Sequence, residues 1–343
     1  MQKYLLLLTL ILALPLSACA PQARTLTIMT HDSFAASEDV IQAFQQETGI
    51  DVSFLSSGDT GTALNKAILS KEKPLADVFY GVDNTFLSRA LAEDIFVTYN
   101  SPLLAAIPDK FKLDPQNQAL PVDYGDVCIN YAIEYFEENN LTPPQSLEDL
   151  TKPEYQGLLV VQNPATSSPG LAFLLATIGY FGPDGYLNYW KRLQTNDVLV
   201  VNDWENAYYG EFSVQGGTHP MVVSYASSPP AEVIFAEPSI SEPPTAALTD
   251  NRSCFRQIEF VGILKGTTKR EQAEQWIDFM LSTRFQEDMP LQMFVYPVNQ
   301  EAALPPEFEE FSTLPAETSV VSPQDIAAYR EQWIQEWTDA ILR

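Results

Sequence analysis

The sequence predicts an α/β protein of two lobes, and three observations support this prediction. The chain has 343 residues, of which 45% are hydrophobic, and this length is near the practical limit for a single core. Short apolar runs typical of strands alternate with amphipathic segments typical of helices, as in β-α-β units on a parallel sheet. The alternation pauses at the apolar run 121–131 and then starts again, which indicates a second lobe.

In the first lobe, strands and helices are expected to alternate. Ser37 is a typical N-cap, and Val40 and Phe44 repeat at helical spacing before Gly49, a residue that suits a helix end. The run 50–55 alternates between apolar and polar residues, as a strand with one buried face does. The expected elements are a strand at 26–29, the helix after Ser37, a strand at 50–55, a loop at 56–61, a helix around 64–68 and a strand at 76–80.

In the second lobe, the clearest element is an amphipathic C-terminal helix. Ser322 can cap this helix, and Pro323 occupies its first position. Its apolar stripe is expected to be core rather than a ligand site, and consists of Ile326, Tyr329, Trp333, Trp337 and Ile341. The elements expected before it are a strand at 158–162, a helix at 169–180, a strand at 221–225, a Pro-rich loop at 237–245, a strand at 258–264 and a helix at 271–281.

The first 19 residues have the features of an export signal. Lys3 gives a positive start, and the apolar segment 5–14 is too short to span a bilayer, which needs roughly twenty residues. The segment 16–19, Leu-Ser-Ala-Cys, resembles the lipobox of bacterial lipoproteins; an ordinary signal peptide with a chance cysteine is the alternative. We therefore expect residues 1–18 to be removed, Cys19 to be lipidated, and the protein to be exported to the periplasm or the outer face of the cytoplasmic membrane.

The composition argues against several classes of protein. Lys and Arg number 19 against 45 Asp and Glu, and the resulting net charge of −26 would repel nucleic acid. Most of this charge is expected to be solvated surface. With two His and three Cys, we expect no metal site and no resident cofactor. The sequence also lacks a GxSxG motif and any other evident nucleophile and base pair, so we expect no enzyme activity.

Two polar loops precede predicted helices and are candidate ligand sites. In the loop 58–61, glycines permit close approach of the backbone, and Asp59 could face a cation; the alternative is that Asp59 only caps the helix. In the segment 166–170, Ser168 and Pro169 are typical of a helix start. Hydroxyls and free N–H groups there suit an anion such as phosphate, although a plain helix cap explains the pattern equally.

A third candidate region combines hydroxyls with aromatic rings. Tyr225 follows a predicted strand in the segment 224–230, which also contains three serines and two prolines. Trp204 lies among polar neighbours, which is unusual for a core tryptophan, although partial packing is the alternative. Aromatic faces beside a carboxylate favour an organic cation, by about 0.5–2 kcal/mol per ring.

Together with blocks elsewhere, these residues resemble the thiamine-binding proteins of bacterial ABC importers, from about residue 25 to the C-terminus. The blocks occur in the family's order at 30–36, 76–78, 81–84, 122–125, 164–171, 204–208, 224–229, 296–298 and 333–337. The resemblance implies a type II periplasmic-binding fold, with two α/β lobes joined by crossover strands and the ligand cleft between them. It further implies a monomer that captures thiamine or its phosphates for an importer permease, held at the membrane by its lipid anchor.

The crossover strands of that fold run in opposite directions, and we place them near 122–127 and 256–261. Pairing Tyr124 with Ile258 would place Cys128 opposite Cys254, so a disulfide there is possible; two unpaired thiols are the alternative. The implied lobes are 19–122 with about 261–300, and 123–260 with about 301–343, the latter including the C-terminal helix.

By position, the family's ligand-binding residues correspond to residues of the three loops and of one later segment, most of them polar or aromatic. They are Asp59, Thr60, Ser167, Ser168, Trp204, Tyr225, Ala226, Ser227, Ser228, Pro229 and Phe294. The thiazolium cation would face Asp59 and the rings, and a phosphate would meet the hydroxyls and helix-start amides.

Three positions depart from the family's pattern. His31 and Ala231 stand where a Tyr is common, and Phe294 stands where a Trp is common. A weaker pyrimidine sandwich or a relative of thiamine as ligand would follow. His31 is expected either to hydrogen-bond the ligand or to be a structural histidine.

Three other functions compete with thiamine binding as interpretations of the sequence. A ferric-iron-binding protein of the same fold could use the adjacent Tyr208 and Tyr209, although the rest of an iron site is not evident. A hydrolase of phosphate esters would need a nucleophile and base pair. A purely structural surface lipoprotein would not need polar loops gathered at strand ends.

Overall fold

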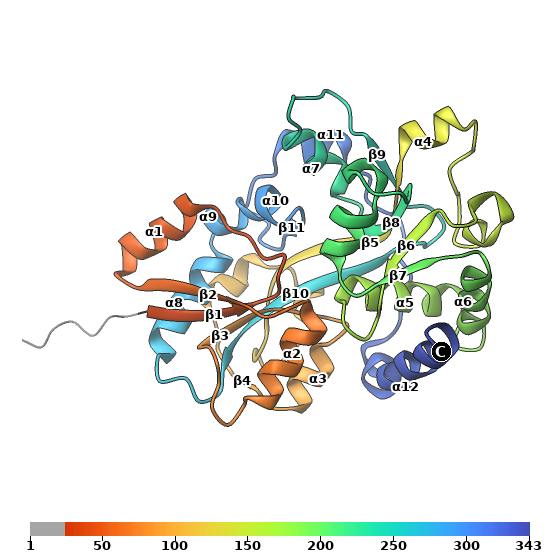
Figure 1. Ribbon diagram of the computed structural model, residues 1–343. Helices are drawn as coiled ribbons and strands as arrows, with labels where there is room; N and C mark the ends of the chain where they lie inside the picture. Colours follow the sequence, from red (N-terminus) through yellow and green to blue (C-terminus); the bar gives the residue numbers. More distant parts are fainter. Residues whose placement is uncertain (1–24) are drawn as a thin grey trace, which may run out of the picture.

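The computed structural model describes residues 25–343 and has two α/β lobes (Figure 1). The predicted signal segment 1–18 and the predicted lipidation site Cys19 lie outside the described residues. Within residues 25–343, no helix combines the length and the apolar character needed to cross a membrane.

The elements alternate along the chain as the sequence predicts. The strands are β1 (Thr25–Thr30), β2 (Asp51–Ser56), β3 (Val78–Asp83), β4 (Phe96–Val97), β5 (Leu120–Ala132), β6 (Leu159–Gln162), β7 (Leu199–Val201), β8 (Met221–Tyr225), β9 (Thr245–Leu248), β10 (Phe255–Leu264) and β11 (Tyr296–Pro297). The helices are α1 (Glu38–Thr48), α2 (Thr60–Leu69), α3 (Leu87–Ala92), α4 (Ile133–Glu138), α5 (Ser168–Phe181), α6 (Tyr186–Thr195), α7 (Ser228–Ile234), α8 (Arg270–Leu281), α9 (Thr283–Gln286), α10 (Met289–Gln292), α11 (Pro306–Phe311) and α12 (Pro323–Ile341). A π-helical turn (Asn206–Glu211) follows β7.

One sheet runs through both lobes in the strand order β2-β1-β3-β10-β5-β8-β6-β7. In one lobe β1 is parallel to β2 and β3, and in the other β6 is parallel to β7 and β8. The long strands β5 and β10 are antiparallel to each other and to their neighbours, and they connect the two lobes (Figure 1). This arrangement confirms the predicted type II periplasmic-binding fold.

The helix caps follow from the sequence, with one correction. Ser37 accepts a hydrogen bond from the N–H of Val40, and Gly49 ends α1 in the left-handed conformation, at φ 67°. Ser322 caps α12 as predicted, by accepting from the N–H of Asp325. The predicted stripe of α12 is wrong at Tyr329, which is 47% exposed; the neighbouring Arg330 is buried in its place. Positions 329 and 330 are each three or four residues from Ile326 and Trp333, so this spacing does not choose between them. Packing does, because the Arg330 guanidinium lies over the ring of Phe86, 5.0 Å from its centroid.

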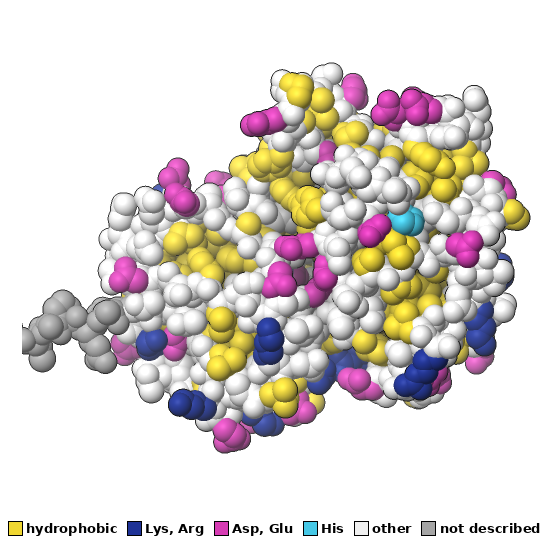
Figure 2. Space-filling view, viewed as in Figure 1, with side chains coloured by type: hydrophobic (Ala, Val, Ile, Leu, Met, Phe, Trp, Pro, Cys, Tyr) yellow, Lys and Arg dark blue, Asp and Glu magenta, His cyan; other side chains and the backbone are white. Residues whose placement is uncertain are grey.

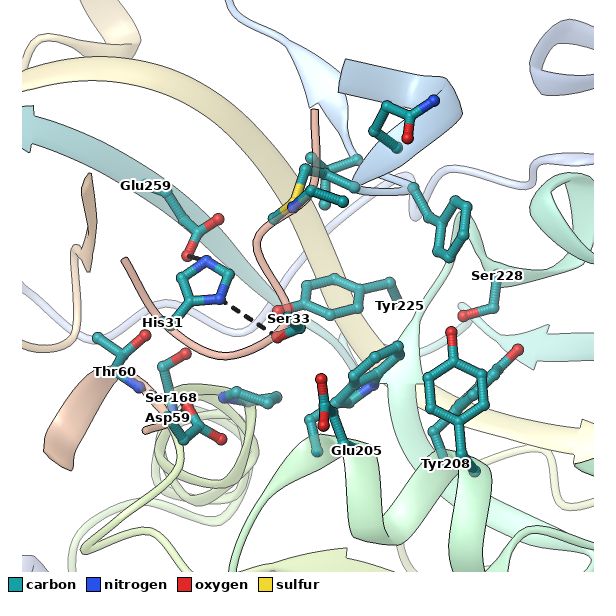
Figure 3. Close-up of a pocket in the computed structure, with 18 residues that line it drawn as sticks. His31, Ser33, Asp59, Thr60, Ser168, Glu205, Tyr208, Tyr225, Ser228 and Glu259 are labelled. Carbon is teal, nitrogen blue, oxygen red and sulfur yellow. Dashed lines mark hydrogen bonds and ion pairs between the residues drawn. The ribbon is translucent and has the colours of Figure 1, made fainter. Parts of the chain in front are cut away.

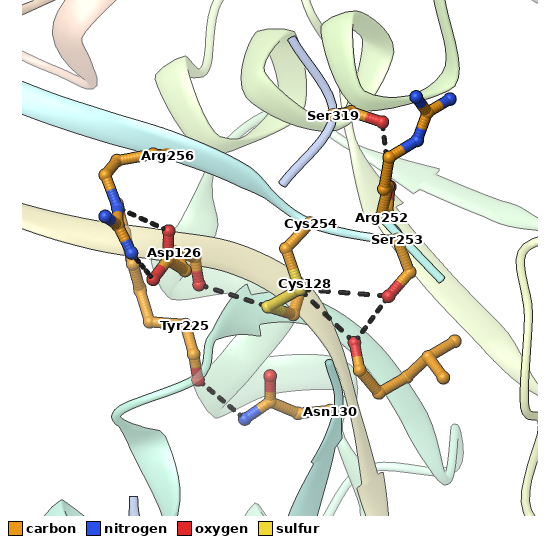
Figure 4. Close-up of a disulfide and its surroundings, with 10 residues drawn as sticks. Asp126, Cys128, Asn130, Tyr225, Arg252, Ser253, Cys254, Arg256 and Ser319 are labelled. Atoms are coloured by element: carbon orange, nitrogen blue, oxygen red, sulfur yellow. Dashed lines mark hydrogen bonds and ion pairs between the residues drawn. A yellow bond between two sulfur atoms is a disulfide. The ribbon is translucent and has the colours of Figure 1, made fainter. Parts of the chain in front are cut away.

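The crossover strands pair in the predicted register. Tyr124 lies opposite Ile258, and Asp126 lies opposite Arg256, whose guanidinium donates to both carboxylate oxygens at 2.9 and 2.7 Å. Just beyond this ion pair, a disulfide joins Cys128 to Cys254 (Figure 4). The two strands are therefore held together by main-chain bonds, an ion pair and a covalent bond at the same end.

The predicted lobe boundaries at 122 and 260 fall inside β5 and β10. The β10 register shifts against β5 after Glu259 and against β3 after Phe260, so the irregular stretch lies near the predicted boundary. The helix α12 packs on α6 and also contacts α3. The division into lobes at these residues stays a prediction.

Candidate functional site

A pocket lies between the two lobes and is lined by loops at the ends of their strands (Figure 3). Its empty volume is about 900 Å³, open solvent at its mouth included. Figure 2 shows acidic side chains gathered where this face of the molecule is hollowed. The lining residues are His31, Ser33, Ala35, Asp59, Thr60, Ser168, Pro169, Trp204, Glu205, Tyr208, Tyr209, Tyr225, Ser228, Glu259, Gln292, Met293, Phe294 and Val295.

The structure brings most of the sequence-predicted site residues together in this pocket. Those that line it are Asp59, Thr60, Ser168, Trp204, Tyr225, Ser228 and Phe294. Those that do not line it are Ser167, Ala226, Ser227 and Pro229, all of which are buried. Ser227 has a different role, because its hydroxyl donates to the carbonyl of Phe294 and so fixes the segment that carries that ring.

Asp59 connects the two lobes at the pocket wall. It is the N-cap of α2, and its Oδ1 accepts the N–H of Thr60 at 2.6 Å. The same oxygen accepts the N–H of Ser168, at the start of α5, at 3.3 Å. Burial raises the pKa of Asp59, although the Ser167 side chain, the charge of His31 and the two backbone hydrogen bonds oppose that shift. Asp59 therefore caps a helix and also lines the pocket, and that it faces a cation stays a prediction.

Aromatic rings form another wall of the pocket. Trp204 stacks on Tyr208, with ring centroids 5.0 Å apart and an interplanar angle of 18°. The indole Nε1 donates to Ser224 Oγ at 3.0 Å, and the phenol of Tyr225 donates to Gln257 Oε1 at 2.6 Å. Because these polar ends are engaged, the ring faces are held in fixed positions beside the cavity.

Phe294 occupies a separate part of the lining. Its ring lies 5.3 Å from that of Phe235, centroid to centroid, and Met293 and Val295 on either side of it also line the pocket. Ala231, one of the three departures from the family, is buried in α7 and does not line the pocket. This side of the pocket is therefore apolar and carries one phenyl ring.

Sequence reasoning did not propose Glu259 as a site residue. It lies in the middle of β10, opposite Asp83 of β3 on one side and Asp123 of β5 on the other. Its Oε1 is 3.4 Å from Nε2 of His31 (Figure 3). Its Oε2 is 3.0 Å from the hydroxyl of Tyr80. A glutamate between isoleucine and phenylalanine in a predicted buried strand was the signal that could have found it.

The carboxyl groups around Glu259 differ in their tendency to ionise. Burial raises the pKa of Asp83 to about 7. Burial, together with the charge of Glu259, raises the pKa of Asp123 well above its usual range. Burial opposes the ionisation of Glu259 as well, but His31 and the surrounding donors outweigh it and lower its pKa. Glu259 is therefore the carboxylate of this group that favours the ionised form most strongly.

His31 is the one basic side chain in the pocket lining. Burial lowers its pKa, but Glu259, Asp59 and Asp32 together raise it more, so the net shift is upward. Its Nδ1 is 3.2 Å from the hydroxyl of Ser33. Among residues 25–343, no group of three or more His, Cys, Asp and Glu side chains is arranged to hold a metal ion. The pocket instead offers ring faces, hydroxyls and carboxylates, which suit an organic cation.

Comparisons with known proteins find similarity to bacterial solute-binding proteins. Residues 73–316 match the family model described as bacterial extracellular solute-binding protein. The thiamine-binding periplasmic protein of Salmonella typhimurium is 31% identical over an alignment of 351 residues, which covers 100% of both chains. A solved periplasmic thiamin binding protein superimposes with a TM-score of 0.81 and is 29% identical, covering 93% of this chain and 96% of its own.

An iron-binding structure shares only the fold. The apo ferric ion-binding protein A of Pasteurella haemolytica has a TM-score of 0.73 and 17% identity, covering 93% of this chain and 98% of its own. The family match spans more than half of the described chain, and the Salmonella typhimurium relative is matched over its whole length. The chain therefore belongs to the bacterial extracellular solute-binding proteins.

Proposed function

We propose that this protein binds thiamine or one of its phosphate esters outside the cytoplasm and passes it to the permease of an ABC importer. The observation that carries the proposal is the pocket between the lobes, where the stacked rings of Trp204 and Tyr208 stand near Asp59 and Glu259. Thiamine contains a permanent thiazolium cation beside an aminopyrimidine ring. Ring faces stabilise such a cation by about 0.5–2 kcal/mol each, and ionised carboxylates add to that.

The named relatives support the same ligand, since the Salmonella typhimurium protein and the solved structure are both described as thiamine-binding. The family supports a role in solute capture for transport, and we propose that the protein has no enzyme activity of its own. Membrane attachment through a lipid on Cys19, and action as a monomer, are further parts of the proposal. Cys19 lies outside the described residues, so mass spectrometry of the membrane-extracted protein is the test of lipidation.

The direct test is calorimetric titration of the chain from residue 20 to 343. Thiamine, its monophosphate and its diphosphate are titrated separately, and ferric citrate serves as the probe for the rival iron-binding function. We expect saturable one-to-one binding of at least one thiamine form and no binding of iron. Absence of binding to every thiamine form would overturn the proposal, and iron binding alone would favour the rival. Release of inorganic phosphate from thiamine monophosphate would show an enzyme instead.

A further inference from the structure

We propose that Glu259 is the carboxylate that pairs with the ligand's cationic ring, and that His31 competes with the ligand for it. This inference rests on the proposed function, because it assumes a cationic ligand in the same pocket. It assigns a specificity role to a residue of the crossover strand β10 and makes ligand affinity dependent on the protonation of one histidine.

The geometry distinguishes Glu259 from the other carboxylates of the pocket. Oδ1 of Asp59 already accepts two backbone N–H groups, and burial raises the pKa of Asp59. Burial also raises the pKa of Glu205, which Asp32 and Asp203 raise further by repulsion. Neither of these two groups is held in the ionised form as strongly as Glu259 is.

Besides His31, two neighbours on adjoining strands, Tyr80 and Asp123, favour the ionised form of Glu259. The hydroxyl of Tyr80 lies 3.0 Å from its Oε2 and 2.6 Å from Asp123 Oδ2. Burial and the charge of Glu259 raise the pKa of Asp123 well above its usual range, which favours its protonated, uncharged form. Asp83, in the strand on the other side, is also largely protonated below about pH 7. Below about pH 7, Glu259 is therefore the dominant negative charge of this group, and it lies on a sheet strand, which is a rigid support.

His31 lies beside the Glu259 carboxylate in the pocket lining. Its Nε2 is 3.4 Å from Glu259 Oε1, which is long for a hydrogen bond, and this nitrogen has no hydrogen-bond partner. The imidazole is in turn held by Ser33 through Nδ1 and packed against Gly81, where an added Cβ would lie 2.4 Å from its Cδ2. The ring is therefore fixed beside Glu259 and cannot move far when a ligand enters.

The protonation of His31 decides what Glu259 can bind. Four carboxylates influence the charge on His31: Glu259 on β10, Asp59 at the start of α2, Asp32 in the adjoining turn and Glu205 before the π-helical turn. The uncharged Tyr80 of β3 packs at 5.7 Å, centroid to centroid. When His31 is protonated, it neutralises Glu259 and repels a cation. When His31 is neutral, Glu259 is free to pair with the cation, so affinity rises as pH rises through the pKa of His31.

The experiment measures affinity against pH with two probes, thiamine and its uncharged thiophene isostere. For the unmodified protein, we expect thiamine affinity to increase about tenfold between about pH 6 and about pH 8.5, with little change for the isostere. His31→Gln keeps a polar side chain of similar size and should flatten the thiamine curve at its high-pH level. Glu259→Gln should weaken thiamine about tenfold at about pH 8 and leave the isostere nearly unchanged.

The possible results separate a failure of this inference from a failure of the proposed function. An unchanged pH slope in His31→Gln, or an equal loss for both probes in Glu259→Gln, would overturn the inference while leaving thiamine binding intact. Failure of both probes to bind the unmodified protein would overturn the proposed function, and the inference with it. Circular dichroism checks the fold of both variants. If Glu259→Gln does not fold, the slope of His31→Gln still decides the question, because His31 acts only through its charge in this scheme.

Discussion

Asp59 is both a helix cap and a pocket-lining residue. It caps α2, bridges to the N–H of Ser168 across the cleft, and lines the pocket. Ser167, the residue before Ser168, is fully buried and does not line the pocket. The sequence motif alone did not show that Ser168 lines the pocket and Ser167 does not, because both serines lie at the start of a predicted helix.

We expect Asp59→Ala to weaken the binding of unphosphorylated thiamine more than Ser167→Ala does. Asp59 contributes charge to the pocket, and its removal should reduce affinity about tenfold, whereas Ser167→Ala should change it less than about threefold. Asp59→Ala also removes a helix cap, at a cost of about 1 kcal/mol of stability. Asp59→Asn, which keeps the cap, is the matched control for the charge. Equal losses of affinity in calorimetry of Asp59→Ala and Ser167→Ala would contradict the assigned roles.

The residues that sequence reasoning found share one property. Asp59, Ser168, Trp204 and Ser228 all follow a strand closely or begin a helix, where backbone rules bring loops to one edge of a sheet. Glu259 was missed because it lies within a strand, where a charged side chain is usually an exposed one. The pairing of β10 with β3 and β5 covers Glu259 on both sides. Only the tertiary structure shows that the Glu259 side chain also reaches the pocket.

At the scale of elements, the crossover strands β5 and β10 determine how the lobes are joined. Their register followed from the antiparallel pairing that the family resemblance implied, and it places the disulfide between Cys128 and Cys254. The ion pair of Arg256 with the buried Asp126 lies two residues from the disulfide on each strand. Export to an oxidising compartment, which we propose, is the condition under which such a bond persists.

Reducing this disulfide should destabilise the protein. The bond closes a loop between cysteines 126 residues apart, and cross-links of long loops stabilise folded proteins by about 2–4 kcal/mol. We expect denaturant unfolding to show a loss of that size on reduction, and in the double variant Cys128→Ala, Cys254→Ala. Intact mass of the exported protein should show no free thiol among these two residues. Two free thiols, or equal stability with and without reductant, would contradict the prediction.

At the scale of the whole molecule, buried acids set how stability depends on pH. Burial raises the pKa of Asp83 to about 7, and it does the same for Glu232, which accepts hydrogen bonds from Tyr208 and Thr245. In the unfolded chain these groups ionise near pH 4. A raised folded-state pKa favours folding while the group is protonated, and this contribution is lost as pH rises through about 7. The raised pKa of His31 acts in the same direction.

We therefore expect the protein to melt at a lower temperature on the alkaline side of neutrality. Between about pH 6 and about pH 8.5 the melting temperature should fall by about 3 °C or more, as calorimetric scanning would show. Glu232→Gln keeps an acceptor for Tyr208 and removes one titrating group, so its melting temperature should change less over the same range. A melting temperature that rises with pH, or an unchanged slope in Glu232→Gln, would count against these buried protonated acids.

The crossover register came from the family resemblance, whereas the sequence by itself determined the α/β class, the alternation of elements and most of the pocket's loop residues. These features depend on local rules: apolar periodicity, caps at Ser37 and Ser322, and glycine or proline at element ends. The tertiary structure decided what those rules cannot express. It placed Arg330 rather than Tyr329 in the core, separated Ser168 from Ser167, and set Glu259 between two acids and beside His31. Such contacts join residues far apart in the chain, and their charges depend on the burial that only the packed fold creates.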